Sequence, residues 1–196
     1  LDIDYIIEDI NDLVNDCLEG TERITTIVHG LKNFSRNDTD FKQIFSINAC
    51  IQDTLKLVQS EIKYTAELST CFENEFNVIG NQGNLSQVLL NLVMNASQAI
   101  GFRKDDEPEL QGLLDITTKK HEDKVLICIT DNGTGIDENN LKHIFDPFFT
   151  TKSVGEGTGL GLSISQNIII KMGGSLEVKT ELGEGSQFII SLPMDE

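Results

Sequence analysis

The chain has 196 residues, and its 15 lysines and arginines stand against 32 aspartates and glutamates, a formal net charge of −17. This length suffices for one ordinary domain plus an additional segment. A field of this sign repels nucleic-acid phosphates and anionic membrane surfaces, so neither is expected as a partner. Because no apolar run reaches membrane-spanning length and no signal peptide is seen, we expect a cytoplasmic location without direct membrane contact.

The cysteines and histidines show no spacing typical of a metal site. No two of the four cysteines form a CxxC pair, so reduced, buried thiols are favoured over disulfides or zinc. The chain also begins inside a helical pattern. We therefore expect a piece of a longer protein, and whether that protein is tethered to a membrane upstream stays open.

Residues 1–36 carry the pattern of one long helix. Apolar residues recur every seventh position, at Ile3, Ile10, Cys17, Ile24 and Leu31. Two further apolar registers widen the stripe, which is typical of a helix in a bundle. One helix cannot bury such a stripe alone, so we expect a partner helix from an upstream segment, a second copy of the chain, or both. Residues 37–43 are polar and are interpreted as a linker to a second domain, residues 44–196.

The second domain shows alternating strand and helix patterns. Strands are expected at 44–47, 67–73, 76–79, 113–119, 124–130, 175–180 and 187–192. Helices are expected at 48–62, with Leu57 among the inward residues, and at 85–102, 138–145 and 160–172. A turn is expected at 80–83 and an acidic loop at 102–111. The patterns predict a mixed strand order that ends antiparallel, without repeated βαβ units.

The helix predicted at 85–102 has an unusual polar face. Its polar residues are uncharged: Gln87, Asn91, Asn95 and Gln98. A solvated helix face normally carries lysine and glutamate, and asparagine is a poor helix former. An ordinary amphipathic helix explains the apolar face but not the two asparagines four residues apart, so this pattern alone leaves a functional and a structural interpretation equally open.

Two glycine-rich segments stand out further along the chain. Residues 131–136 (DNGTGI) follow a predicted strand, and residues 155–162 (GEGTGLGL) precede a predicted helix. A glycine-rich turn at a helix start presents N–H groups and a positive dipole end to phosphate. The first segment is therefore expected to hold a base and the second a phosphate chain. A P-loop is excluded because no Gly-Lys pair exists, and the Rossmann GxGxxG pattern is also absent.

Four segments together resemble the motifs of sensor histidine kinases. Residues 87–96 (QVLLNLVMNA) resemble the N box, 131–135 the first glycine box, 145–152 (FDPFFTTK) the F box and 157–162 the second glycine box. They occur in family order. The resemblance implies an α/β two-layer sandwich of a mixed sheet and helices, the Bergerat-type ATP-binding fold. It also implies that residues 1–36 are the second helix of a dimerisation hairpin, and the 148–152 sequence is similar to the nitrogen-regulation type.

The resemblance further implies residue roles toward ATP and Mg²⁺. Asp131 would accept a hydrogen bond from the adenine amino group, Asn95 would bind Mg²⁺, and Asn91 and Lys152 would be catalytic, with Lys152 meeting the γ-phosphate; otherwise Lys152 is a solvated lysine. The implied ATP-binding set is Asn91, Asn95, Asp131, Gly133, Gly135, Ile136, Thr151, Lys152, Gly157, Thr158, Gly159, Leu160, Gly161 and Leu162. Three phenylalanines are assigned equally to ligand or core: Phe145, Phe148 and Phe149.

Two positions depart from the family pattern. Gln98 stands where many members carry a lysine, which would leave the phosphate charge mainly to Mg²⁺ and Lys152. The family's reactive histidine lies in the first hairpin helix and precedes an acidic residue, whereas His29 precedes Gly30 in the second helix. We do not assign His29 as the phosphoacceptor.

The expected function is that of the C-terminal part of a sensor histidine kinase. Such a protein transfers the γ-phosphoryl group of ATP to a histidine absent from this chain, then to the receiver domain of a response regulator, and would form a homodimer through residues 1–36. One alternative is an ATP hydrolase of the same superfamily, although those members usually carry glutamate at the Asn91 position and an asparagine cannot act as a base. The other is a non-catalytic nucleotide-binding module.

Overall fold

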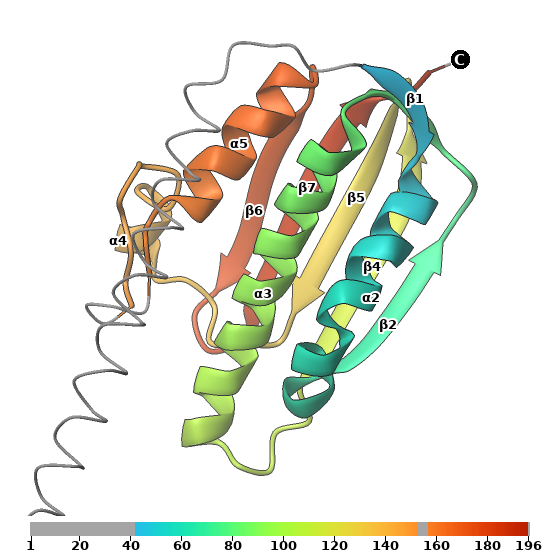
Figure 1. Ribbon diagram of the computed structural model, residues 1–196. Helices are drawn as coiled ribbons and strands as arrows, with labels where there is room; N and C mark the ends of the chain where they lie inside the picture. Colours follow the sequence, from blue (N-terminus) through green and yellow to red (C-terminus); the bar gives the residue numbers. More distant parts are fainter. Residues whose placement is uncertain (1–41, 153–156, 196) are drawn as a thin grey trace, which may run out of the picture.

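The computed structural model describes residues 42–152 and 157–195. The predictions for residues 1–36 and for most of the linker lie outside these ranges. The described residues form two layers, a five-stranded sheet and a layer of helices on one of its faces (Figure 1). None of the helices in these ranges is long and apolar enough to cross a membrane.

The sheet has the strand order β2-β4-β5-β7-β6. Its strands are β2 (Glu67–Phe72), β4 (Leu113–His121), β5 (Lys124–Asp131), β6 (Ser175–Glu181) and β7 (Gly185–Pro193). Strand β2 runs parallel to β4, and all other pairs are antiparallel. A separate antiparallel ribbon joins β1 (Gln43–Ser46) and β3 (Asn77–Gly80). The mixed sheet and its two hairpins, β4–β5 and β6–β7, confirm the predicted sandwich.

The helices differ from the predicted ones mainly at their ends. They are α2 (Ile47–Thr65), α3 (Gln82–Asp106), α4 (Glu138–Leu141) and α5 (Gly161–Lys171). The predicted turn at 80–83 is wrong, because the Asn81 side chain accepts from the Asn84 N–H at 3.1 Å and caps the start of α3. Helix α3 also continues through the predicted acidic loop as far as Asp106. Its last turn is supported by an ion pair between Arg103 and Glu107 at 3.2 Å.

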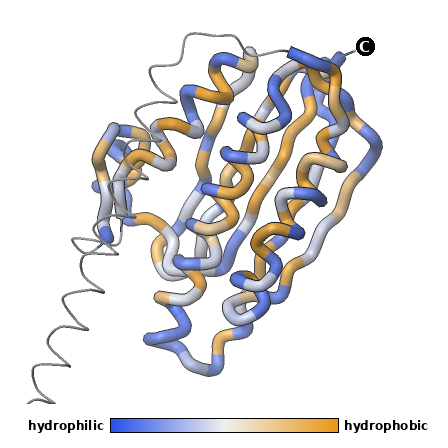
Figure 2. Tube along the Cα trace, in the orientation of Figure 1, coloured by the Kyte–Doolittle hydropathy of each residue, from blue (hydrophilic) through white to orange (hydrophobic). Residues whose placement is uncertain are grey.

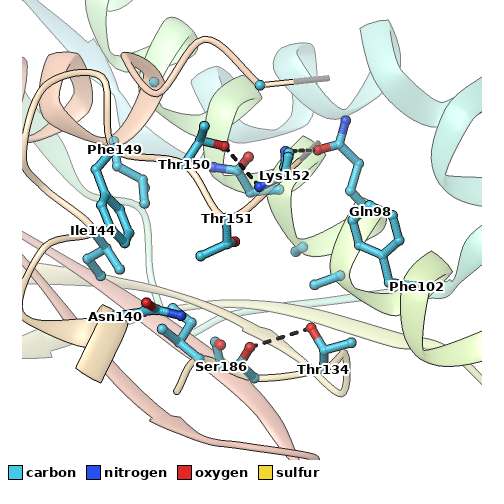
Figure 3. Close-up of a pocket in the computed structure, with 18 of the residues that line it drawn as sticks. Gln98, Phe102, Thr134, Asn140, Ile144, Phe149, Thr150, Thr151, Lys152 and Ser186 are labelled. Carbon is cyan, nitrogen blue, oxygen red and sulfur yellow. Dashed lines mark hydrogen bonds between the residues drawn. The ribbon is translucent and has the colours of Figure 1, made fainter. Parts of the chain in front are cut away.

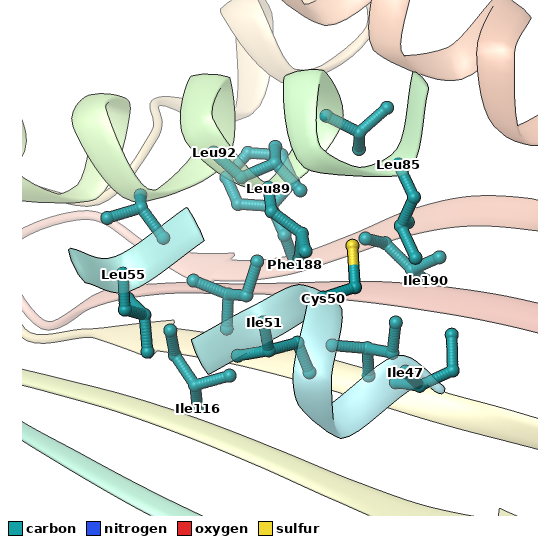
Figure 4. Packing of buried hydrophobic residues seen from close by; sticks show 14 of the residues in the cluster. Ile47, Cys50, Ile51, Leu55, Leu85, Leu89, Leu92, Ile116, Phe188 and Ile190 are labelled. Carbon is teal, nitrogen blue, oxygen red and sulfur yellow. The ribbon is translucent and has the colours of Figure 1, made fainter. Parts of the chain in front are cut away.

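The core lies between the sheet and helices α2 and α3. Strand residues such as Ile116 and Ile190 face Ile51 of α2 and Leu89 of α3, and each is at most 1% exposed (Figure 4). Strand β5 lies in the middle of the sheet and is largely apolar along its length (Figure 2). Burial of this shared apolar surface is the main stabilising contribution to the fold.

The cysteines of the described residues are free thiols. Cys50 and Cys128 are buried, as expected, whereas Cys71 is exposed on the edge strand β2. Burial raises the pKa of the Cys50 thiol, which keeps it protonated and unreactive.

The prediction for one core residue is wrong. Leu57 was expected to point inward with Leu55, but its side chain is 75% exposed while Leu55 is 8% exposed. Two positions along an α-helix correspond to a rotation of about 200°, so neighbours two apart face nearly opposite directions. The inward face of α2 is completed by Ile51, Val58 and Ile62.

This contrast predicts unequal effects of the same substitution. Leu55→Ala should lower the free energy of unfolding by about 2 to 4 kcal/mol, because it leaves a cavity in the core. Leu57→Ala should change it by no more than about 0.5 kcal/mol. Urea unfolding of the two variants beside the unmodified protein measures both values, and equal losses would contradict the described orientation of α2.

Candidate functional site

A cavity of about 840 Å³ lies between α3, the end of β5, the segment around α4 and the start of α5 (Figure 3). This volume is that of a typical small-molecule or cofactor pocket. Most of the predicted site residues line it: Asn91, Asn95, Asp131, Gly135, Ile136, Thr151, Lys152, Gly157, Thr158, Gly159, Gly161 and Leu162. Gly133 and Leu160 are not among the lining residues. The fold therefore brings all four sequence motifs to one place.

Asp131 is a buried carboxylate at the end of β5. Its side chain lines the cavity although the residue is only 6% exposed. Burial raises the pKa of Asp131 to about 6, and backbone hydrogen bonds from Gly133 and Ser186 partly offset that rise. The Gly133 N–H donates to Oδ1 at 2.9 Å. At neutral pH this group is thus an ionised acceptor suited to a ligand N–H.

The turn after Asp131 packs tightly against α3. A Cβ on Gly133 would lie 2.6 Å from the backbone carbonyl carbon of Ala99, so only glycine fits there. The Thr134 N–H donates to the Ala99 oxygen at 3.2 Å, and Arg103 Nη1 donates to the Asn132 oxygen at 3.2 Å. The glycine at position 133 is therefore required by protein packing, and its N–H orients the carboxylate rather than lining the cavity.

The polar face of α3 forms one wall of the cavity. Asn91, Asn95, Gln98 and Phe102 line it at successive turns of the helix. The Asn91 Nδ2 donates to the Ser165 hydroxyl of α5 at 3.1 Å. Phe102 was not predicted as a site residue, because the helix was expected to end there. Its spacing of seven residues from Asn95 continues the same face and is the signal that would have indicated it.

The second glycine segment lies at the start of α5. Gly159 has φ of +64° and packs against Phe148, whose N–H donates to the Gly159 oxygen at 2.8 Å. Helix α5 has no side-chain cap at its N-terminus. Backbone N–H groups at such an end carry a partial positive charge and suit an anionic ligand. Leu160 instead turns inward and is 8% exposed.

Lys152 supplies the positive charge of the cavity. Among the described residues that line it, Lys152 is the one cationic side chain. Its ammonium donates to Gln98 Oε1 on α3, and its backbone N–H donates to the Thr150 hydroxyl at 3.2 Å (Figure 3). The cation therefore lies on the α3 side of the cavity, beside the asparagine stripe.

The three phenylalanines of the F-box segment divide between core and cavity. Phe149 lines the cavity and also packs against the core. Phe145 packs against the core, and Phe148 is 64% exposed with φ of +68°. Phe149 is thus the member of the three that can contact a ligand.

Ser186 is a lining residue that the sequence did not indicate. It is the partner of Asp131 in the β5–β7 register. Thr180 Oγ1 donates to the Gly185 oxygen at 2.9 Å and accepts from the Ile136 N–H at 2.9 Å. Because the single Thr180 proton is used in this way, the Ser186 hydroxyl at 2.9 Å is the donor of their shared hydrogen bond. Its oxygen can then accept a hydrogen bond beside Asp131.

The oxygen ligands that the cavity offers suit a hard metal ion that is bound together with phosphate. The described residues contain no group of three or more histidine, cysteine or acidic side chains that could hold a metal. Asn95 offers a neutral amide oxygen in the cavity. Magnesium is commonly held by one or two protein oxygens together with substrate phosphates, and Asn95 fits that arrangement.

The fold and the cavity define an α/β domain that binds a nucleotide. A family model described as "Histidine kinase-, DNA gyrase B-, and HSP90-like ATPase" matches residues 80–196, and the chain belongs to this family. This family membership gives ATP as the ligand class. It also confirms the predicted fold, since solved histidine-kinase catalytic domains share it.

Similar proteins indicate which branch of this family the chain resembles. The chain is 38% identical over 181 residues to the signal transduction histidine-protein kinase AtoS of Escherichia coli, covering 91% of this chain and 28% of AtoS. It is 38% identical to the sensor histidine kinase ZraS of Salmonella typhimurium, covering 78% of this chain and 31% of ZraS. The chain thus spans less than a third of these relatives.

Solved structures give the same result. The nucleotide-free catalytic domain of histidine kinase ThkA is 31% identical with a TM-score of 0.66, covering 78% of this chain and 97% of that one. ThkA in complex with the response regulator protein TrrA is 28% identical with a TM-score of 0.75, covering 95% of this chain and 52% of that one. The described domain is therefore an ATP-binding catalytic domain of the sensor histidine kinase type.

The buried carboxylate predicts a pH-dependent stability difference. The raised pKa of Asp131 means that the folded state binds its proton more tightly than the unfolded state. This contribution to stability is present below about pH 4 and is lost as pH rises through about 6. Asp131→Asn removes the effect, so its stability advantage over the unmodified protein should widen by roughly 1 kcal/mol between pH 5 and pH 7.5.

Urea unfolding at the two pH values measures this difference. The exposed Asp123, in the β4–β5 turn, offers a matched control in Asp123→Asn, which should show no such widening. A constant gap for Asp131→Asn would contradict the destabilising burial of its charge.

Proposed function

We propose that this chain is the ATP-binding catalytic part of a two-component sensor histidine kinase. In the whole protein, the γ-phosphoryl group of ATP passes to a histidine outside this chain and then to an aspartate of a response regulator. The observation that carries the proposal is a single cavity with the Asp131 carboxylate in one part and Lys152 and the α5 N-terminus in another. The names of the relatives and the ThkA complex with a response regulator support it.

The base end of the cavity fits adenine, the base of the ATP that the family binds. The ionised Asp131 accepts a hydrogen bond, and the adenine amino group donates one. The Ser186 hydroxyl oxygen beside it offers a second acceptor, directly or through water. The flanking turn, held to α3 by the Thr134 and Arg103 hydrogen bonds, keeps the carboxylate in place. We assign adenine recognition to Asp131, with Gly133, Gly135 and Ile136 forming the turn.

The phosphate end provides positive charge and backbone donors. Lys152 and the N–H groups of the 157–162 segment bind the phosphate chain, and Thr151 and Leu162 complete the wall. Asn95 would hold Mg²⁺, which would neutralise phosphate charge when bound. Phosphoryl transfer needs little covalent chemistry from the protein, so positioning and charge stabilisation by these residues are the catalytic contribution.

The side chain at position 91 argues against the hydrolase alternative. An asparagine amide cannot accept a proton from water at neutral pH, so Asn91 cannot act as a general base. Asn91 instead bonds Ser165, and a Cβ on Gly161 would lie 2.2 Å from its Oδ1. It therefore holds the start of α5 against α3, which places the phosphate-binding segment. The presence of all four motifs around one cavity argues against a non-catalytic nucleotide-binding module.

We also propose an assembly and a cell location from the sequence. By resemblance to the family, residues 1–36 would be the second helix of a dimerisation hairpin and residues 37–43 a linker, and two copies of the chain would pair through that helix. The protein acts in the cytoplasm on a response regulator receiver domain.

The adenine assignment predicts the effect of one substitution. Asp131→Asn should weaken ATP binding by about 10- to 100-fold or more, because a charged hydrogen bond to the base is lost. Calorimetric titration with MgATP at pH 7.5 measures the affinity, with Asp123→Asn as the matched control that should bind normally. Retained affinity in Asp131→Asn would overturn the adenine assignment.

The metal assignment predicts a change in Mg²⁺ dependence. ATP binding to the unmodified chain should strengthen as Mg²⁺ is added, and Asn95→Ala should largely remove that dependence, since the protein oxygen ligand is gone. The test is a pair of titrations with and without Mg²⁺ for each protein. A dependence that stays unchanged in Asn95→Ala would contradict the role of this residue.

The transfer reaction predicts where label appears. Incubation with γ-labelled ATP should leave this chain unlabelled, because the accepting histidine is not part of it. The same chain added to a dimerisation hairpin that carries the upstream histidine should transfer label to that histidine. Acid-labile label on His29 would overturn our decision not to assign it as phosphoacceptor.

A further inference from the structure

We propose that Gln98 is a positioning residue that holds Lys152 where it binds the terminal phosphate. This inference rests on the proposed function, because it concerns the phosphate end of the same cavity. Gln98 lies on the cavity wall of α3, one turn beyond Asn95, and the Lys152 ammonium donates to its Oε1 (Figure 3). The contact joins residues 54 positions apart, so it links the F-box segment to the helix that carries the metal-binding asparagine.

Lys152 is held at both ends of its side chain. A Cβ on Gly157 would lie 3.3 Å from both Cβ and Cδ of Lys152, so the aliphatic part packs against that glycine. The main chain from which the side chain extends is held as well, because the Lys152 backbone N–H donates to Thr150 Oγ1 at 3.2 Å. With Gln98 at the ammonium end, a flexible side chain is restrained before a nucleotide arrives. Restraining it in advance lowers the entropic cost of binding phosphate.

The amide of Gln98 suits this role because it is neutral. A glutamate at position 98 would form an ion pair with Lys152 and reduce the charge that acts on phosphate. A lysine there would repel Lys152 from α3. An ammonium can donate three hydrogen bonds, so Lys152 can keep its bond to Gln98 and also donate to a phosphate oxygen. Gln98 therefore places the cation without neutralising it.

A double-mutant cycle tests the coupling between the two residues. The four proteins are the unmodified chain, Gln98→Ala, Lys152→Met and the double variant, each titrated calorimetrically with MgATP and MgADP. Gln98→Ala should weaken ATP binding about tenfold and ADP binding much less, since the loss concerns the terminal phosphate. In the Lys152→Met background the same change should cost less than about twofold.

Two further variants make the comparison specific. Gln98→Glu should weaken ATP relative to ADP at least as much as Gln98→Ala, although it keeps a partner for Lys152. Gln87→Ala changes another glutamine of the same helix that does not line the cavity, and it should leave both affinities unchanged. Gln98 is exposed, so these variants are expected to fold.

The outcomes separate this inference from the proposed function. Additive losses in the cycle, or equal weakening of ATP and ADP by Gln98→Ala, would overturn the role of Gln98 while ATP binding itself stands. Failure of the unmodified chain to bind ATP would instead overturn the proposed function. Coupled losses specific to ATP, with no effect of Gln87→Ala, would support the inference.

Discussion

The burial of one carboxylate at the end of β5 governs the architecture of this site. Burial raises the pKa of Asp131, and the backbone N–H groups of Gly133 and Ser186 that donate to it limit that rise and favour the ionised form. The first donor requires a turn so close to α3 that position 133 must be glycine. The second requires β7 to pair with β5 in its observed register. The charge costs stability in the empty domain, a common property of binding groups that a ligand later satisfies.

Much of the fold follows from local pattern in the sequence. The apolar patterns at 113–119, 124–130, 175–180 and 187–192 predicted the four strands β4, β5, β6 and β7. The polar stripe of α3, which the sequence left open between two interpretations, forms a wall of the cavity. The sequence predictions were wrong where tertiary contacts determine the local structure. The pair of Arg103 and Glu107 supports a helical turn in a segment that is acidic and otherwise loop-like. Leu57 is apolar yet exposed, because it lies two positions from Leu55 and so on nearly the opposite side of α2.

Site residues that lie within a sequence motif could be predicted. Site residues that are brought in by the sheet register or by a long-range contact could not. Asn91, Asn95 and Asp131 lie within recognisable segments, and the structure brings them to one cavity. Ser186 becomes a neighbour of Asp131 only through strand pairing across 55 positions of chain. The bond between Gln98 and Lys152 likewise joins distant segments. Glycines of both motifs also proved to be needed for packing within the protein, at Gly133 against Ala99 and at Gly161 against Asn91.

Helix α3 contacts the start of α5 at Asn91 and the turn after β5 at Ala99. Eight residues of α-helix separate these contacts by about 12 Å. In the proposed binding mode, the helix therefore fixes the distance between the base and the phosphate groups of the ligand. Deleting one residue between the two contacts would shorten the distance between them by about 1.5 Å and rotate one contact by about 100° about the helix axis relative to the other. Insertions and deletions should therefore be selected against in this part of α3, while the β4–β5 turn is free to vary in length.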